Sequence, residues 1–292
     1  MNRIKGILYA AVSSSTFGLA PIFSITLLLA GFSAFEVLSY RWGVASIVLI
    51  VFGWLSGCNF RLAGKDWGVV FLLSLLRAVT SFSLIIAYQN IASGVASTIH
   101  FMYPLAVALA MMFFFREKKS LLVILAVLMS LLGAALLSLG ELEAKSGNTM
   151  VGLVAACVSV FSYAGYIVGV RTTRAVQINS TALTCYVMGL GTIFYLIGAY
   201  CTSGLQLVSD GYTWLIILGL ALPATAISNI TLVQAIKYAG PTLTSILGAM
   251  EPLTAVVIGV FVFKELFTVN SAVGIILILL AVSIVVFRRQ KS

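Results

Sequence analysis

Long uncharged apolar runs constrain this chain more than any other feature. Glycine, proline, asparagine and charged clusters divide it into ten apolar segments, most of about 20 residues, enough for a helix to cross a bilayer core of roughly 30 Å. The runs lack the period-two alternation of a membrane β-barrel. Only 9% of the 292 residues are charged, whereas a soluble domain carries about a quarter. The sequence predicts an all-α integral membrane protein with ten transmembrane helices.

The expected spans, from N- to C-terminus, lie near 7–29, 35–56, 68–88, 93–115, 120–140, 150–170, 180–203, 212–234, 240–263 and 268–287. The apolar stretch after the basic start continues to about residue 30 without a clear cleavage site, so we expect a retained first helix rather than a signal peptide.

The basic residues between the spans predict the orientation. With the N-terminus inside, thirteen Lys and Arg residues face the cytoplasm and only Lys145 and Lys264 face the opposite side, a strong positive-inside signal. The thirteen are Arg3, Lys5, Arg61, Lys65, Arg116, Lys118, Lys119, Arg171, Arg174, Lys237, Arg288, Arg289 and Lys291. We therefore expect a multi-pass protein of the cell (inner) membrane with both termini cytoplasmic. The net charge of +9 then reflects cytoplasmic loops, and no nucleic-acid partner is expected.

The two halves of the chain repeat. A shift of 148 residues places Pro104 on Pro252 and Glu117 on Glu265 without a gap, together with several apolar matches. We expect one five-helix repeat at 1–145 and a second at 146–292. Five is an odd number, so the second repeat must cross the membrane upside down. Inverted repeats are typical of transporters whose binding site lies near the midplane.

These features resemble the drug/metabolite transporter superfamily, and specifically its bacterial EamA-type members. The resemblance covers nearly the whole chain. It depends on the two five-helix repeats, on a Tyr-Pro-x12-Glu pattern matched by Glu-Pro-x12-Lys-Glu-Leu, and on the ending GIILILLAVSIV (274–285). The matched residues are Tyr103, Pro104 and Glu117, then Glu251, Pro252, Lys264, Glu265 and Leu266. The resemblance implies a ten-helix transporter of amino acids, related metabolites or drugs, without naming the substrate.

Two prolines are expected to break helices inside the membrane. Pro104 and Pro252 each remove a backbone N–H group and free a carbonyl at mid-depth. Such breaks line the cavity of a transporter, although a packing kink is an equally good explanation.

The fourth span carries Ser97, His100 and Tyr103 at helical spacing. The repeat shift pairs His100 with Gly248 and Tyr103 with Glu251. If the repeats face each other across a pseudo-two-fold axis, Gly248 could leave room for the imidazole. The alternative is a histidine that is hydrogen-bonded within a helix interface.

Arg77 lies near the middle of the third span, and the equivalent eighth span carries Thr225, Ser228 and Asn229. A buried guanidinium must face a carboxylate, water or an anionic substrate group. Glu251 is the only acidic residue at a comparable depth. We expect Arg77 and Glu251 to bound one cavity. Glu251 either balances Arg77, carries a coupling proton, or stays neutral on carbonyls freed by the proline.

Other polar residues receive more modest expectations. Tyr163 and Tyr166 of the sixth span would present aromatic faces to a partly apolar ligand, or else pack in the core. Arg41 is expected to reach the outer headgroups or to neutralise Glu36 one turn back. Glu117 and Glu265 stand at span ends and are expected to be structural, each favouring the N-terminus of the following helix.

Taken together, the sequence predicts a secondary transporter that moves a small zwitterionic or amphiphilic metabolite, such as an amino acid, with export as the expected direction. Alternating access would place the cavity between the halves, with a proton as a second substrate and a monomer or homodimer in the bilayer. No cofactor or metal is expected, and no nucleotide-binding loop is present. The alternatives are an uncoupled facilitator or exchanger, a channel, and an intramembrane enzyme, which would need paired aspartates or a zinc motif that the chain lacks.

Overall fold

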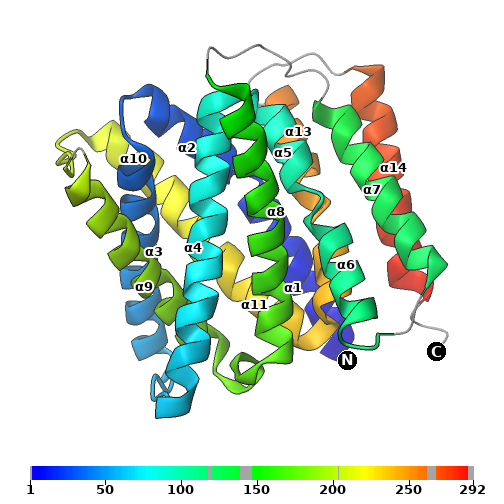
Figure 1. Cartoon of the computed structure of the whole chain (residues 1–292), viewed down its shortest axis with the longest axis horizontal. Coiled ribbons are helices and arrows are strands. Elements are labelled where there is room, and N and C mark those ends of the chain that lie inside the picture. The colour runs from blue at the N-terminus through cyan, green and yellow to red at the C-terminus, as the bar shows by residue number, and fades with distance from the viewer. Residues whose placement is uncertain (1, 118–119, 139–146, 203, 262–267, 289–292) are drawn as a thin grey trace.

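The computed structural model describes residues 2–117, 120–138, 147–202, 204–261 and 268–288. Within these ranges the regular elements are helices, arranged as one bundle in which the start of α1 and the end of α14 lie at the same end (Figure 1). Lys264 and Glu265 of the second motif lie outside the described residues.

The N-terminal half holds α1 (Asn2–Phe17), α2 (Ala20–Leu29), α3 (Ala34–Leu55), η1 (Gly64–Asp66), α4 (Trp67–Asn90), α5 (Ser93–His100), α6 (Tyr103–Phe113) and α7 (Leu121–Ser138). The C-terminal half holds α8 (Thr149–Thr172), η3 (Arg174–Gln177), α9 (Ser180–Cys201), α10 (Gly211–Ala221), η4 (Leu222–Ile227), α11 (Ser228–Ala239), α12 (Pro241–Leu247), α13 (Met250–Phe261) and α14 (Val269–Arg288).

Helices long and apolar enough to span a membrane occupy most of the expected segments. In the described part of the chain, seven helical segments are long and apolar enough to cross a bilayer, and shorter apolar helices occupy 121–133 and 272–284. The seven are Arg3–Leu29, Ala34–Leu55, Gly64–Asn90, Val95–Phe113, Thr149–Thr172, Ser180–Cys201 and Gly211–Ala239. The full count of ten crossings and the inversion of the second repeat stay predictions.

Several spans are interrupted near mid-length, and each interruption is followed by a proline. Pro104 stands in the first turn of α6, after the break that separates it from α5, and Pro252 holds the same place in α13 after the break from α12. Two further breaks, not foreseen from the sequence, carry Pro21 at the start of α2 and Pro223 in the π-helical turn η4. Proline is tolerated in the first turn of a helix, where its missing N–H would have no partner.

Helix pairing crosses between the two halves. The dominant partner of α1 is α11 and that of α4 is α8, while α3 pairs with α9 and α7 with α14. Figure 1 shows α7 beside α14 at one side of the bundle and α3 with α9 at the other. In terms of the expected repeat, α1 corresponds to α8, and each of them packs against the third span of the opposite half.

Glycines permit the close approach of these helices. A Cβ at Gly133 of α7 would lie 2.8 Å from the carbonyl oxygen of Gly274 in α14. A Cβ at Gly191 of α9 would overlap the indole ring of Trp42, a side chain of α3 that is only 1% exposed. Small residues at such contacts are how membrane helices approach closely without a hydrophobic driving force between them.

Polar contacts tie the helices together at the end of the bundle that carries the N-terminus. Arg171 donates to the carbonyl of Lys237 at 3.0 Å, and the Lys237 ammonium donates to the carbonyl of Ile178. Thr242 of α12 donates to the Glu117 carboxylate at 2.5 Å. Glu117, expected to serve only the following helix, therefore also connects the α6–α7 link to the second half of the chain.

Apolar and aromatic packing closes the same end of the bundle. A Cβ at Gly6 in α1 would lie 2.7 Å from the backbone nitrogen of Ala239 in α11, and the rings of Tyr9 and Tyr238 stack at 6.0 Å. We call this region, from Gly6 and Ala239 to the Thr242–Glu117 bond, the N-terminal closure.

The glycine contacts make a prediction with a close control. Gly191→Ala is expected to lower the thermal unfolding temperature of the detergent-solubilised protein, because overpacking against a fixed ring costs about 1–3 kcal/mol. Gly189→Ala, on the same helix with nothing within 4 Å of the added Cβ, is expected to be neutral or slightly stabilising. Equal melting temperatures for the two variants would contradict the α3–α9 contact.

Candidate functional site

Arg77 of α4 is fully enclosed and is held from both halves of the chain. Its side chain is 1% exposed. Its Nε donates to Oδ1 of Asn229 in α11 at 3.1 Å, and its Nη1 donates to Oγ of Ser81 at 3.3 Å. Ser81 and Asn229 are equivalent under the 148-residue shift. The guanidinium is thus anchored by one polar side chain from each copy of the expected repeat.

Aromatic rings supply the rest of the Arg77 environment. The guanidinium carbon lies 5.0 Å from the ring centre of Tyr163, 5.4 Å from that of Phe17 and 5.9 Å from that of Tyr166. Cation–π attraction contributes most where the cation is removed from water. The rings therefore stabilise the charge without neutralising it.

His100 ends α5 and stacks on the same group of rings, 5.4 Å from Tyr163 and 5.5 Å from Tyr103. Its Nδ1 lies 2.8 Å from Oγ of Ser159, and that hydroxyl donates its proton to the Ala156 carbonyl at 2.6 Å. The imidazole must then be the donor at Nδ1, which leaves an acceptor lone pair on Nε2. Nε2 is buried and has no hydrogen-bond partner in the described part of the chain.

Tyr103 and Glu251, which the repeat shift places at equivalent positions, meet. The Tyr103 hydroxyl lies close enough to the carboxyl group of Glu251, which is partly buried, for the two side chains to interact. The room at Gly248 is taken by the Tyr103 hydroxyl, with which an added Cβ would overlap. The expectation that Gly248 makes space for His100 was therefore wrong. The longer phenol reaches the neighbouring α12–α13 break, and the imidazole turns to Ser159 instead.

Arg77 and Glu251 belong to one cluster but do not form an ion pair. Their charges are close enough to interact, yet no nitrogen and oxygen of the two side chains lie within 4.0 Å. Within the described ranges, the ion pair that the chain does form is Arg174–Asp66 at 3.9 Å, far along α4 from Arg77. We define the central cluster as Arg77, His100, Tyr103, Tyr163, Tyr166 and Glu251.

Arg41 lies inside the bundle, and the expectation that it reaches the headgroups was wrong. Its side chain is 4% exposed. Its Nε donates to Oγ1 of Thr225 at 2.7 Å and its Nη2 to the Ala224 carbonyl at 3.4 Å. The packing of α3 against η4 offers these acceptors at mid-depth, so the side chain turns inward.

Glu36 does not neutralise Arg41 either. Its carboxylate accepts the backbone N–H groups of Ser33 at 2.8 Å and Gln206 at 2.7 Å. With Ser33 it forms a capping box that begins α3. The Glu36 carboxylate is therefore hydrogen-bonded to backbone N–H groups, one turn away from Arg41.

The π-helical turn η4 explains why Thr225 and Asn229 are available to the two arginines. Pro223 removes one backbone donor, and the wider turn frees carbonyl groups. Thr225 donates to the Leu220 carbonyl at 2.7 Å, so its oxygen is aimed at Arg41. Asn229 donates to the Thr225 carbonyl at 2.7 Å, which fixes its own carbonyl oxygen toward Arg77.

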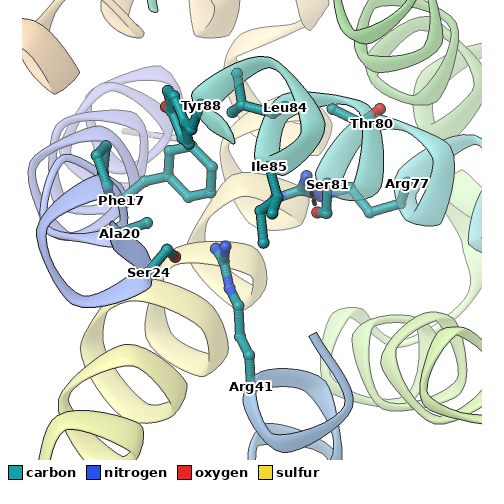
Figure 2. Close-up of a pocket in the computed structure, with 11 residues that line it drawn as sticks. Phe17, Ala20, Ser24, Arg41, Arg77, Thr80, Ser81, Leu84, Ile85 and Tyr88 are labelled. Carbon is teal, nitrogen blue, oxygen red and sulfur yellow. Dashed lines mark hydrogen bonds between the residues drawn. The ribbon is translucent and has the colours of Figure 1, made fainter. Parts of the chain in front are cut away.

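A cavity lies beside both guanidinium groups, in the half of the bundle away from the N-terminus. Its free volume is about 20 Å³, room for about one water molecule, and Figure 2 shows the Arg41 guanidinium pointing into it between Ser24 and Ile85. We call it the arginine cavity. Its lining consists of Phe17, Ala20, Pro21, Ser24, Arg41, Arg77, Thr80, Ser81, Leu84, Ile85 and Tyr88.

The structure brings most of the residues selected from sequence together, but not all. Ser97 lies 3.3 Å from the hydroxyl of Tyr88, at the margin of the arginine cavity. Ser228 offers its carbonyl to Ser13 at 2.8 Å. Phe17 and Arg41 were missed. The 146-residue match of Phe17 with Tyr163 was a signal for the first, and a charge eight residues inside a span was a signal for the second.

A bundle of apolar helices with broken spans, an enclosed charged cluster and a central cavity defines a membrane transport protein rather than an enzyme. Comparison with known proteins agrees. The EamA-like transporter family matches twice, at residues 4–139 and 150–287, so the chain belongs to this family. Membership of this family is consistent with the drug/metabolite transporter superfamily that the sequence motifs resemble.

Two known proteins are similar to this chain. An uncharacterized transporter of Archaeoglobus fulgidus is 28% identical over 238 residues, which cover 80% of this chain and 83% of the relative. A crystal structure of a protein whose function is not stated superposes with a TM-score of 0.79 at 17% identity, over 97% of this chain and 96% of the other. At that identity the likeness concerns the fold alone.

The contact between Tyr103 and Glu251 predicts coupled effects. Tyr103→Phe and Glu251→Gln are each expected to lower the unfolding temperature, and the double variant to lower it by less than the sum, because both variants disturb the same contact. Tyr186→Phe, which loses a bond to the Phe60 carbonyl elsewhere, serves as the control and should be additive with Tyr103→Phe. Strict additivity of the first pair would contradict the contact.

Proposed function

We propose that this EamA-like transporter moves a small metabolite with a cationic and an anionic group, such as an amino acid, through the central cluster by alternating access. The observation that carries the proposal is the separation of Arg77 from Glu251 inside the bundle. An enclosed cation and carboxylate that do not pair with each other leave two opposite charges for a substrate. The tyrosine rings between them suit its apolar part.

The orientation follows from the basic residues. The end of the bundle that carries the N-terminal closure also carries Arg171, Arg174 and Lys237, so the positive-inside rule places it in the cytoplasm. The arginine cavity then lies in the outer half of the protein. The conformation is the one expected of a carrier closed toward the cytoplasm, and export requires that the closure open to load the substrate.

Repeat-related contacts support an inverted-repeat mechanism. Tyr103 meets its equivalent Glu251, and Ser81 and its equivalent Asn229 share Arg77. Equivalent residues meet only close to a symmetry axis. The helix breaks lie at this same depth, so the substrate site would stand where the two halves rock against each other.

Glu251 is the residue through which a proton would be exchanged. It is partly buried, its neighbour is the phenol of Tyr103, and it forms no ion pair with Arg77. A carboxylate in such a position can alternate between a charged and a neutral form as the cavity opens to either side. The neighbouring Nε2 of His100, which lacks a partner among the described residues, is a second acceptor within the cluster.

The first experiment compares the media of cells overproducing wild type, Glu251→Gln or an empty vector, by untargeted mass spectrometry. We expect one or a few zwitterionic metabolites to accumulate outside with wild type only. Asp210→Asn is the matched control. Asp210 lies before α10, where a backbone hydrogen bond from Thr213 lowers the pKa of its carboxyl group, and asparagine keeps this helix cap. Asp210→Asn is expected to export like wild type.

Purified protein in liposomes then separates the mechanisms. With the metabolite identified, Glu251→Gln is expected to keep saturable exchange of labelled for unlabelled substrate but to lose accumulation driven by a pH gradient. Unchanged accumulation would make Glu251 structural and leave an uncoupled facilitator. Flux without saturation or exchange would point to a channel, and chemical conversion of the compound to an enzyme.

The closure can be tested by accessibility. In a background without the native cysteines, Ser24→Cys in the arginine cavity is expected to react with a membrane-impermeant thiol reagent added outside intact cells, and Thr242→Cys in the N-terminal closure is expected to stay protected. Glu117→Gln, which weakens the bond to Thr242, should reduce labelling of Ser24→Cys by releasing the closure. Labelling of Thr242→Cys from outside, with Ser24→Cys protected, would reverse the proposed orientation.

A further inference from the structure

We propose that Arg41 and Arg77 form one anion-binding site in the arginine cavity, and that the substrate carries a second anionic group there, as an acidic amino acid or a similar amino dicarboxylate does. This inference deepens the proposed function and depends on it. It concerns a residue, Arg41, that the sequence did not place in the site.

Both guanidinium groups face the same space. The guanidinium carbon of Arg41 lies 5.5 Å from the ring centre of Phe17, and that of Arg77 lies 5.4 Å from the same ring centre. The two arginines approach from different helices, α3 and α4, and both line the cavity, as Figure 2 shows. Phe17 is therefore a shared wall between two positive charges.

Each side chain is held by two hydrogen bonds, one from Nε and one from an Nη atom, while its other Nη atom has no hydrogen-bond acceptor among the described residues. Thr225 fixes Nε of Arg41 and Asn229 fixes Nε of Arg77. A guanidinium has about five N–H donors, so most of the donors of the pair have no acceptor in the described part of the chain. Neither guanidinium has a nitrogen that is both fully buried and unpaired, and both side chains line the cavity.

No acid of the cavity lining balances the two charges. Apart from the arginines, the lining consists of apolar, hydroxyl and phenol side chains. Glu36 is engaged by backbone N–H groups, and Glu251 lies on the other side of the Arg77 environment with Tyr103. Two like charges in a low-dielectric cavity repel each other, and a bound anion relieves this repulsion.

Charge balance indicates the class of substrate that carries the anionic group. Arg41, Arg77 and Glu251 sum to one net positive charge in and beside the cavity. A neutral zwitterion leaves that charge unbalanced, whereas a substrate with one cationic and two anionic groups compensates it. Arginine is also the cation best suited to a planar carboxylate, which it binds through two parallel N–H groups.

The test uses an isosteric pair of probes that differ in one charge. The melting temperature of the full chain in detergent is measured with increasing L-glutamate or L-glutamine, in gluconate buffer. We expect wild type to be stabilised by glutamate at concentrations at least tenfold lower than glutamine requires. Arg41→Gln should abolish this difference, and Arg41→Lys should restore part of it. Arg61→Gln, at an exposed position outside the bundle core, should behave like wild type.

Several outcomes would overturn the inference. Equal stabilisation of wild type by both probes, or an unchanged glutamate preference in Arg41→Gln, would remove the second anion site. Stabilisation by chloride alone to the same extent as by glutamate would assign the two arginines to an inorganic anion. If Arg41→Gln does not fold, glutarate against glutaramide on wild type repeats the charge comparison without a variant.

Exchange in liposomes keeps this inference separate from the proposed function. If no zwitterion, acidic or neutral, is exchanged by wild type, the proposed function itself fails. If exchange occurs but glutamate competes no better than glutamine for it, the transporter stands and only the paired-arginine site is lost.

Discussion

The structure depends on one constraint, which is that the guanidinium of Arg77 cannot lose its charge and yet lies inside an apolar bundle. Four helices meet around it because each supplies something that the charge needs. The amide of Asn229 comes from α11, the hydroxyl of Ser81 from α4 itself, and the rings of Phe17 and Tyr163 from α1 and α8. A carboxylate in salt-bridge contact would satisfy the charge fully. Its absence from the described surroundings leaves the guanidinium stabilised but still able to attract an anion.

Broken helices allow this arrangement of polar groups within a membrane. An unbroken helix hides every backbone group, whereas an interrupted one presents carbonyls and side chains at mid-depth, where they are satisfied by protein rather than by lipid. The α5–α6 break delivers His100 and Tyr103, the α12–α13 break delivers Glu251, and η4 delivers Thr225. The irregular turns therefore supply His100, Tyr103, Glu251 and Thr225, whereas the regular helices α3 and α4 carry the two arginines.

The sequence predicted the all-helical class of fold well, because apolar length is additive along the chain. It also found Arg77, His100, Tyr103 and Glu251, since polar residues are conspicuous among apolar ones. It failed to predict the directions in which some polar side chains point. For Arg41, position in the span favoured the headgroups, but the acceptors on η4 belong to a helix far away in sequence. For Gly248, the repeat shift correctly predicted free space beside the glycine but not the side chain that fills it. Which side chain fills such a space depends on three-dimensional packing.

The exchange of partners between the halves has a consequence for how the protein is made. The main partners of α1 are α11, α12, α13 and η4, all of which are translated after residue 220, and α4 packs chiefly against α8. The first helices to enter the membrane therefore cannot complete their contacts while the N-terminal half is alone. Until the second half arrives, Arg77 has its Ser81 partner but neither Asn229 nor Tyr163. The biogenesis of this transporter requires an early intermediate in which a bare arginine is kept from lipid, by the insertion machinery or by water.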